Sequence, residues 1–193
     1  MLLTCGSTGR PILARRRRPG TGARATRASR RRRDGTVAAV GAAVVRRADA
    51  SDAEAVALVS ARSRAAAMPW LPVLHTPEED VAFFRRELAA GTGWVVVDGD
   101  RVLGFAVVDD AAGELGHLYL EPDARRRGLG TALVAVARAH HPGPLRLWCF
   151  RDNTGARAFY AALGAVQVGQ TDGSGNEEGL PDVLLELPAT TTA

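Results

Sequence analysis

The chain has 193 residues, of which 46% are hydrophobic and 24% charged, and its 25 lysine-plus-arginine residues are all arginines. This length allows one folded domain with an extension, and this composition excludes a fibrous or wholly disordered chain. The formal net charge of +4 would indicate a nucleic-acid or anionic-membrane partner if the charge were spread evenly.

The positive charge is concentrated in residues 1–36. This segment carries eleven arginines and one acidic residue, a charge of +10, whereas the other 157 residues carry 14 arginines and 20 acidic residues, a charge of −6. The segment has few large apolar residues, so we expect it to be disordered. A nucleic-acid-binding basic arm and a mitochondrial-type transit peptide are alternatives to our preferred interpretation, an incidental extension. We expect residues 37–188 to form the single folded domain and residues 189–193 to be a disordered C-terminus.

The first half of the expected domain combines one short strand with two helices. The strand is expected at residues 44–46. Residues 51–54, Ser-Asp-Ala-Glu, predict a capping box that begins the first helix. Residues 76–79, Thr-Pro-Glu-Glu, predict a second capping box, for a helix that ends at Gly91.

Strands dominate the middle of the chain. Two β-branched runs, residues 94–97 and 102–108, flank an Asp-Gly-Asp turn and predict a hairpin, which a strand at residues 114–120 extends to an antiparallel meander. Apolar periodicity then predicts a helix at 128–140, a strand at 145–150, a helix at 153–163, and strands at 166–168 and 183–187. This order describes a single α/β (α+β) domain with a mixed sheet.

A glycine- and arginine-rich turn follows the strand at residues 114–120. It reads Arg-Arg-Arg-Gly-Leu-Gly from Arg125 to Gly130 and leads directly into a helix. The N-terminus of a helix binds anions through its unpaired N–H groups, and arginines add donors suited to phosphate. The pattern is neither a P-loop nor a dinucleotide fingerprint, and taken alone it also fits a structural turn.

Two motifs together resemble the GNAT-type N-acetyltransferases. Arg125-x-x-Gly128-x-Gly130 resembles the pyrophosphate-binding motif of that family, and Asn153 followed seven residues later by Tyr160, in a helix ending Leu-Gly, resembles its second element. The resemblance covers roughly residues 43–187. It implies a GNAT-like domain with a mostly antiparallel sheet, helices on both faces, and a V-shaped splay between two central strands.

The resemblance also implies an acetyl-CoA site at that splay. Backbone groups of Leu118 and Leu120 would bond the acetyl and pantetheine part, Asn153 would bond the cofactor arm, and Tyr160 would protonate the leaving sulfur. A core aromatic role is the alternative for Tyr160. The full set of residues implied in cofactor binding is Leu118, Tyr119, Leu120, Arg125, Arg126, Arg127, Gly128, Leu129, Gly130, Thr131, Asn153 and Tyr160.

The general base remains open between two residues. Glu114 matches the position of the glutamate in histone-acetylating members, and His117 fits by its pKa. Strict alternation would place these two side chains on opposite faces of the strand, so we expect only one in the cleft. Trp148 stands where ribosomal-protein acetyltransferases carry a glutamate, which argues against that subfamily. His75 and Trp70 would line the acceptor side or simply pack.

We therefore expect an enzyme that transfers an acetyl group from acetyl-CoA to a primary amine of a small molecule or peptide. The alternatives are a non-catalytic acyl-CoA sensor and a nucleic-acid-binding protein acting through the arginine-rich segment, although we do not expect a nucleic-acid partner. No metal-ligand spacing, membrane span or convincing secretory signal is found. Cys5 and Cys149 form no disulfide framework, so we expect a cytoplasmic protein, monomeric or homodimeric.

Overall fold

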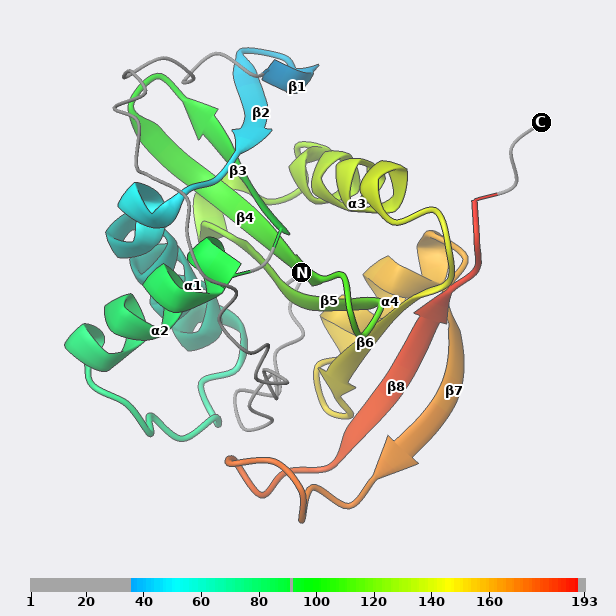
Figure 1. Ribbon diagram of the computed structural model, residues 1–193. Helices are drawn as coiled ribbons and strands as arrows, with labels where there is room; N and C mark the ends of the chain where they lie inside the picture. The colour runs from blue at the N-terminus through cyan, green and yellow to red at the C-terminus, as the bar shows by residue number, and fades with distance from the viewer. Residues whose placement is uncertain (1–35, 91, 191–193) are drawn as a thin grey trace, which may run out of the picture.

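The sheet that organises the protein has eight strands in the order β1-β2-β3-β4-β5-β6-β8-β7. The computed structural model describes residues 36–90 and 92–190, so the expectations for residues 1–35 and 191–193 lie outside the described residues (Figure 1). The strands are β1 (Thr36–Val40), β2 (Ala43–Arg47), β3 (Thr92–Asp98), β4 (Arg101–Asp109), β5 (Glu114–Leu120), β6 (Leu145–Phe150), β7 (Val166–Thr171) and β8 (Asp182–Leu187). The helices are α1 (Ala53–Ala67), α2 (Pro77–Ala90), α3 (Leu129–His140) and α4 (Thr154–Ala162), with short 3-10 turns η1 (Ala50–Asp52) and η2 (Pro122–Ala124).

The sheet is mixed and mostly antiparallel, as predicted, and it splays at its centre. Every neighbouring pair is antiparallel except β5 and β6, which run parallel and pair at Glu114 and Arg146, the N-terminal part of both strands. Figure 1 shows β6, β8 and β7 turned away from the β1–β5 part of the sheet. The C-terminal halves of β5 and β6 therefore border an opening in the sheet.

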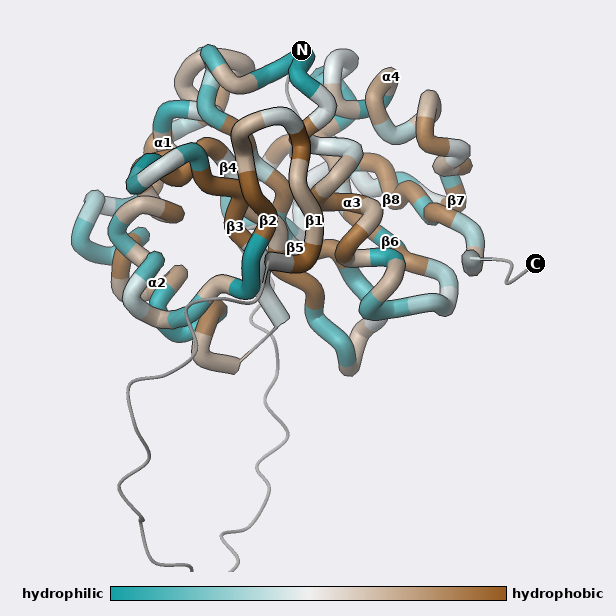
Figure 2. The backbone as a smooth tube through the Cα atoms, turned by 90° about the horizontal axis from the view of Figure 1, so that it is seen from above, coloured by the Kyte–Doolittle hydropathy of each residue, from teal (hydrophilic) through white to brown (hydrophobic). Residues whose placement is uncertain are grey.

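Helices cover both faces of the sheet, and each face has its own core. One core packs α1 and α2 on β3–β5 through residues such as Phe84 and Phe105. The other packs α3 and α4 on the opposite face through residues such as Leu133 and Phe159. Figure 2 shows the hydrophobic residues concentrated in the central strands between these helices. Burial of these two apolar surfaces is the main force that stabilises the fold.

One predicted capping box is confirmed, and the other lies two residues earlier than predicted. Before α2, Thr76 N–H donates to Glu79 Oε2 at 2.8 Å and Glu79 N–H donates to Thr76 Oγ1 at 3.3 Å, as the predicted capping box requires. Before α1 the box is formed by Asp49 and Asp52 instead of residues 51–54. Arg46 also pairs with the Asp52 carboxylate at 2.7 Å, and Asp49 N–H donates to Asp52 Oδ2 at 3.0 Å, so the ion pair holds Asp52 in the box.

The edge strand β1 was not predicted. It pairs antiparallel with β2 through a turn at Gly41, whose φ is +61°. Its sequence, Thr-Val-Ala-Ala-Val, has little of the alternation that marks a half-buried strand. Its first residue, Thr36, lies one position before the expected start of the domain.

Candidate active site at the central splay

Strand β5 presents backbone groups to the opening between β5 and β6. Glu121 N–H donates to Leu103 O at 2.8 Å across the junction with β4. Hydrogen-bonded and non-hydrogen-bonded pairs alternate in this antiparallel register, so the N–H and C=O groups of Leu118 and Leu120 point away from β4, toward the opening. Tyr119 has the opposite orientation. Its backbone faces β4 and its ring stacks on Phe105 in the core under α1 and α2.

The N-terminus of α3 follows β5 and is built to bind an anion. Gly128 is its N-cap, with φ of +79°, and makes no side-chain cap hydrogen bond. Arg126 also has a left-handed φ, of 63°. Leu129 is buried and anchors the first turn in the core, while Thr131 is exposed. The first-turn N–H groups have no partners within a helix, so they and the helix dipole favour negative charge at this point.

The three arginines of this turn differ in their environments. Arg126 and Arg127 are exposed, and Arg127 lies 4.0 Å from Asp98. Arg125 is half-buried, and burial lowers the pKa of its guanidinium. Its Nη2 donates to the Ser63 carbonyl at 3.4 Å, but its buried Nε has no partner among the described residues. A buried cationic donor without a partner fits a site that takes an anion such as pyrophosphate.

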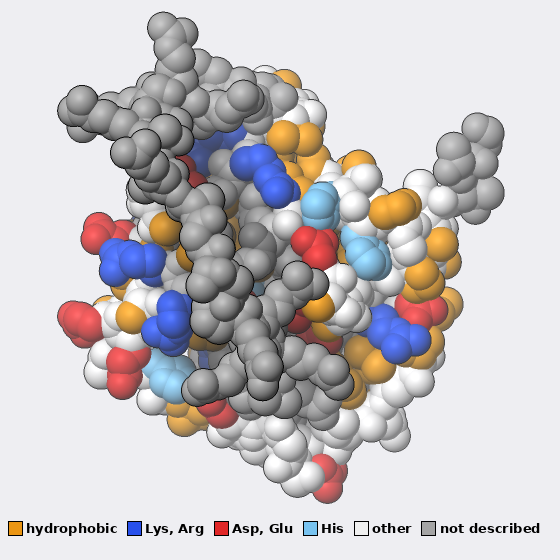
Figure 3. Space-filling view, viewed as in Figure 1, with side chains coloured by type: hydrophobic (Ala, Val, Ile, Leu, Met, Phe, Trp, Pro, Cys, Tyr) orange, Lys and Arg blue, Asp and Glu red, His pale blue; other side chains and the backbone are white. Residues whose placement is uncertain are grey.

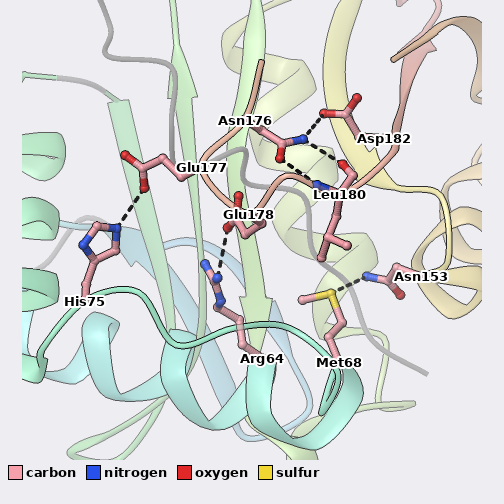
Figure 4. Close-up of polar contacts among 9 residues, drawn as sticks. All are labelled: Arg64, Met68, His75, Asn153, Asn176, Glu177, Glu178, Leu180 and Asp182. Carbon is pink, nitrogen blue, oxygen red and sulfur yellow. Dashed lines mark hydrogen bonds and ion pairs between the residues drawn. The ribbon is translucent and has the colours of Figure 1, made fainter. Parts of the chain in front are cut away.

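The second predicted motif lies at α4, on the other side of the opening. The Asn153 side chain caps α4 by accepting from Ala156 N–H at 3.1 Å, and its amide donates to Met68 Sδ at 3.5 Å (Figure 4). Tyr160 lies seven residues further, two turns along the same face, and is fully buried. Asn153 thus ties α4 to the end of α1, and this contact holds the helix that carries Tyr160.

A bulge in β5 brings both candidate bases into one cavity. Val108 pairs with Leu115 but Val107 pairs with His117, so Gly116 is an extra residue in the ladder. Such a bulge resets the alternation of side chains. Glu114 and His117 therefore line the same cavity, and the expectation that they lie on opposite faces is wrong.

This cavity has a volume of about 1220 Å³ and lies between α1, α2, the start of β5 and the β7–β8 loop. Its walls combine apolar side chains, such as Met68, Leu71 and Phe83, with charged ones. The carboxylates on its walls are Glu79, Asp80, Glu87, Asp109, Glu114 and Glu177, and the arginines are Arg64 and Arg86. The balance of charge suits a cationic ligand.

His117 is held neutral on the wall of this cavity. The residue is 5% exposed, and its ring centroid lies 5.6 Å from that of Phe83 and 5.2 Å from that of Phe84. Burial, aided by the positive charge of Arg64, lowers the pKa of His117 to about 4. Its Nδ1 is buried and has no hydrogen-bond partner among the described residues. The wall of the cavity therefore carries a neutral imidazole with one buried nitrogen that no described residue binds.

The β7–β8 loop, which lies near the C-terminal end of the sequence, forms one wall of the cavity. Glu178, whose side chain is fully buried, pairs with Arg64 at 3.1 Å, and Glu177 lies 2.9 Å from His75 (Figure 4). His75 and Trp70, the two residues expected on the acceptor side, therefore lie in different environments. His75 lines the cavity, whereas Trp70 packs edge-on against Phe150 at 6.0 Å between ring centroids.

Sequence reasoning missed the pair formed by Arg64 and Glu178. These residues are 114 positions apart, and no local pattern marks either of them. Within residues 36–90 and 92–190, no three His, Cys, Asp or Glu side chains are grouped so that they could hold a metal ion. In the same residues, no helix is long and apolar enough to cross a membrane.

Three features define the class of protein. They are a splayed sheet, an anion-binding helix N-terminus after β5, and a cavity at the N-terminal half of β5. The acetyltransferase (GNAT) family model matches residues 61–165, more than half of the chain, and the chain belongs to this family. Over 70 residues the chain is 40% identical to a mycothiol acetyltransferase from Thermomonospora curvata, covering 35% of this chain and 24% of that protein. The chain thus spans only about a quarter of that relative's length.

Solved structures show the same fold. YjaB from Escherichia coli, in its apo form, has a TM-score of 0.63 at 23% identity, over 77% of this chain and 99% of that one. The protein yncA from Salmonella typhimurium, solved with its cofactor acetyl-CoA, has a TM-score of 0.59 at 19% identity, over 78% of this chain and 96% of that one. At these identities the likeness supports the fold alone.

Proposed function

We propose that this protein transfers an acetyl group from acetyl-CoA to a primary amine of a small molecule or peptide. The observation that carries the proposal is the position of β5 between two sites. The anion-binding N-terminus of α3 follows its C-terminal end, and the cavity with Glu114 and His117 lies at its N-terminal half. Family membership supports the same conclusion.

Acetyl-CoA supplies the thioester that the amine attacks. The backbone amides from Arg126 to Thr131 are suited to its pyrophosphate, with Arg125 adding charge beside them. The backbone groups of Leu118 and Leu120 that face the opening are suited to the amide groups of its pantetheine arm. An N–H on this edge of β5 can also stabilise the negative charge that develops on the thioester oxygen.

We assign different roles to His117 and Glu114, the two residues proposed as bases. His117 is buried, and its pKa of about 4 leaves the ring neutral, with a nitrogen lone pair that can accept a hydrogen bond. We therefore assign His117 the role of a hydrogen-bond acceptor that orients the neutral amine. Glu114 is partly exposed, so it can pass the proton of the amine to solvent.

Tyr160 is the proposed general acid, which protonates the sulfur as it leaves. Tyr160→Phe removes the proton but keeps the ring, so we expect kcat to fall by about a hundredfold. The dissociation constant for acetyl-CoA, measured by calorimetry, should stay within about twofold of wild type. A variant with unchanged kcat would exclude Tyr160 from proton transfer.

We also place the protein in the cytoplasm, as a monomer or homodimer. Cys149 is a buried free thiol, which fits a reducing compartment.

A further inference from the structure

Helix α2 turns an acidic face toward the cavity. Asp80, Phe83 and Glu87 are spaced so that they share one face of the helix, and all three line the cavity. Burial raises the pKa of both carboxyl groups, which means that each carboxylate is partly desolvated. Neither makes an ion pair or a hydrogen bond with any residue that the structure describes.

Two further carboxylates stand near Glu87, on the strands at the same end of the cavity. Asp109 and Glu114 are direct partners in the β4–β5 register, and Asp109 raises the pKa of Glu87 by repulsion. Asp109 Oδ1 accepts from the N–H groups of Ala111 and Ala112, which orders this turn. In the described part of the chain these carboxylates are not grouped as metal ligands, so an extended organic cation fits them better than a metal ion.

An independent observation points to a ligand in this cavity. His117 is 95% buried on the same wall, and its Nδ1 lacks a partner among the described residues. A buried polar atom without a partner is costly unless a ligand meets it. The cavity thus offers an acceptor for one amine at His117 and negative charge for a second at Glu87, and the Phe83 ring, one turn before Glu87 on α2, lies 5.6 Å from the His117 ring.

We propose that the acceptor is an aliphatic diamine or polyamine, whose second ammonium group is bound by Glu87 and Asp109 while the reacting amine lies at His117. This inference rests on the proposed function, because it names the acceptor of the same reaction. The Phe83 side chain, which lies beside His117 and one helical turn before Glu87, suits the methylene chain between the two amines.

The test compares α,ω-diamines of increasing length with monoamines of matched length, at low ionic strength and with saturating acetyl-CoA. We expect kcat/KM to be at least about tenfold higher for the best diamine, the size of effect given by a hydrogen bond to a charged group. Glu87→Gln should remove most of that preference by raising KM for the diamine and leave the monoamine unchanged. Glu78→Gln, an exposed carboxylate of the same helix outside the cavity, is the matched control and should keep the preference.

The outcomes separate this inference from the proposed function. Equal kcat/KM for diamines and monoamines, with normal turnover, overturns the diamine site and leaves the acetyl transfer standing. Loss of the preference in Glu78→Gln to the same degree as in Glu87→Gln also overturns it, because bulk charge would then explain the effect. If Glu87→Gln does not fold, calorimetry on the wild-type protein decides: tighter binding of the diamine supports the site, and equal binding contradicts it.

Discussion

His117 depends on its neighbours for its protonation state. The rings of Phe83, Phe84 and Tyr119 exclude water around it, and Arg64 adds a positive charge nearby. Both effects oppose a charged imidazole, so the folded protein binds a proton at His117 less readily than the unfolded chain does. The stability of the fold is therefore linked to the pH.

The pH dependence of unfolding should show this linkage. The pKa of His117 rises from about 4 in the folded state to the ordinary value of 6.5 in the unfolded chain, so the unfolded chain binds more protons between these values. The contribution is fully present above about pH 6.5 and is lost as the pH falls toward 4. From about pH 7 to about pH 5 it amounts to about 2 kcal/mol. Urea unfolding of wild type and His117→Gln at both pH values measures this contribution. An equal loss of unfolding free energy in the two proteins would contradict the low pKa of His117.

The sequence predicts the motif residues well but places the two bases incorrectly. Gly128 and Gly130 lie at the start of α3 as expected, because a helix N-terminus after a strand is a local feature. The relation between Glu114 and His117 depends on the bulge at Gly116, which is set by the pairing of β5 with β4. The one local sign is Gly116 itself, since a glycine inside a strand often marks a bulge, and the sequence prediction did not use it.

Helix α3 owes its anion-binding geometry to the left-handed conformation at its start. Gly128→Ala puts a side chain where φ is +79°, at a cost of about 1 to 2 kcal/mol. The new methyl group would also stand beside the N–H groups proposed for the pyrophosphate, so we expect the dissociation constant for acetyl-CoA to rise about tenfold.

Gly164, just after α4, provides the matched control. It has a φ of +86° and no atom within 4 Å of an added Cβ. Gly164→Ala should lose a similar unfolding free energy and keep its affinity for acetyl-CoA, with calorimetry and thermal unfolding as the two readouts. Equal weakening of acetyl-CoA binding in both variants would argue against a specific role for the α3 N-terminus.

The β7–β8 loop is held by the pair of Arg64 and Glu178. Because the Glu178 side chain is fully buried, Arg64→Met removes the cation that lies 3.1 Å from a desolvated carboxylate, at a cost of about 3 to 5 kcal/mol. Arg85→Met breaks an exposed contact of 4.0 Å with Glu54 and should cost less than about 1 kcal/mol. Denaturant unfolding measures the free energy of unfolding of both variants. A loss in Arg64→Met as small as that in Arg85→Met would show that the pair of Arg64 and Glu178 contributes little to stability.

At the scale of the whole molecule, charge is divided unevenly along the chain. The residues after position 36 carry a formal charge of −6, and Figure 3 shows acidic and basic side chains interspersed on one face of the described part. The acidic residues that matter for the proposed reaction lie inside the cavity, beside His117. An overall excess of negative charge favours the approach of a cationic acceptor.

Much of the architecture could be predicted from periodicity, because burial of one face imposes it. The meander from β3 to β5 and the helices α2, α3 and α4 follow from such patterns. The closure of the cavity could not be predicted in this way. It depends on the contacts of Glu177 and Glu178 with the α1–α2 region, which lies more than 100 residues earlier in the chain. These contacts form only once the chain has folded.

The most direct test of acetyl transfer is the release of CoA thiol by the purified wild-type protein, given acetyl-CoA and a panel of primary amines. We expect thiol release that requires both substrates, together with a product in which an acetyl group replaces one hydrogen of the amine nitrogen. Tight binding of acetyl-CoA without thiol release from any amine would contradict the proposed catalysis and indicate an acyl-CoA sensor. A folded protein that does not bind acetyl-CoA would contradict the whole account.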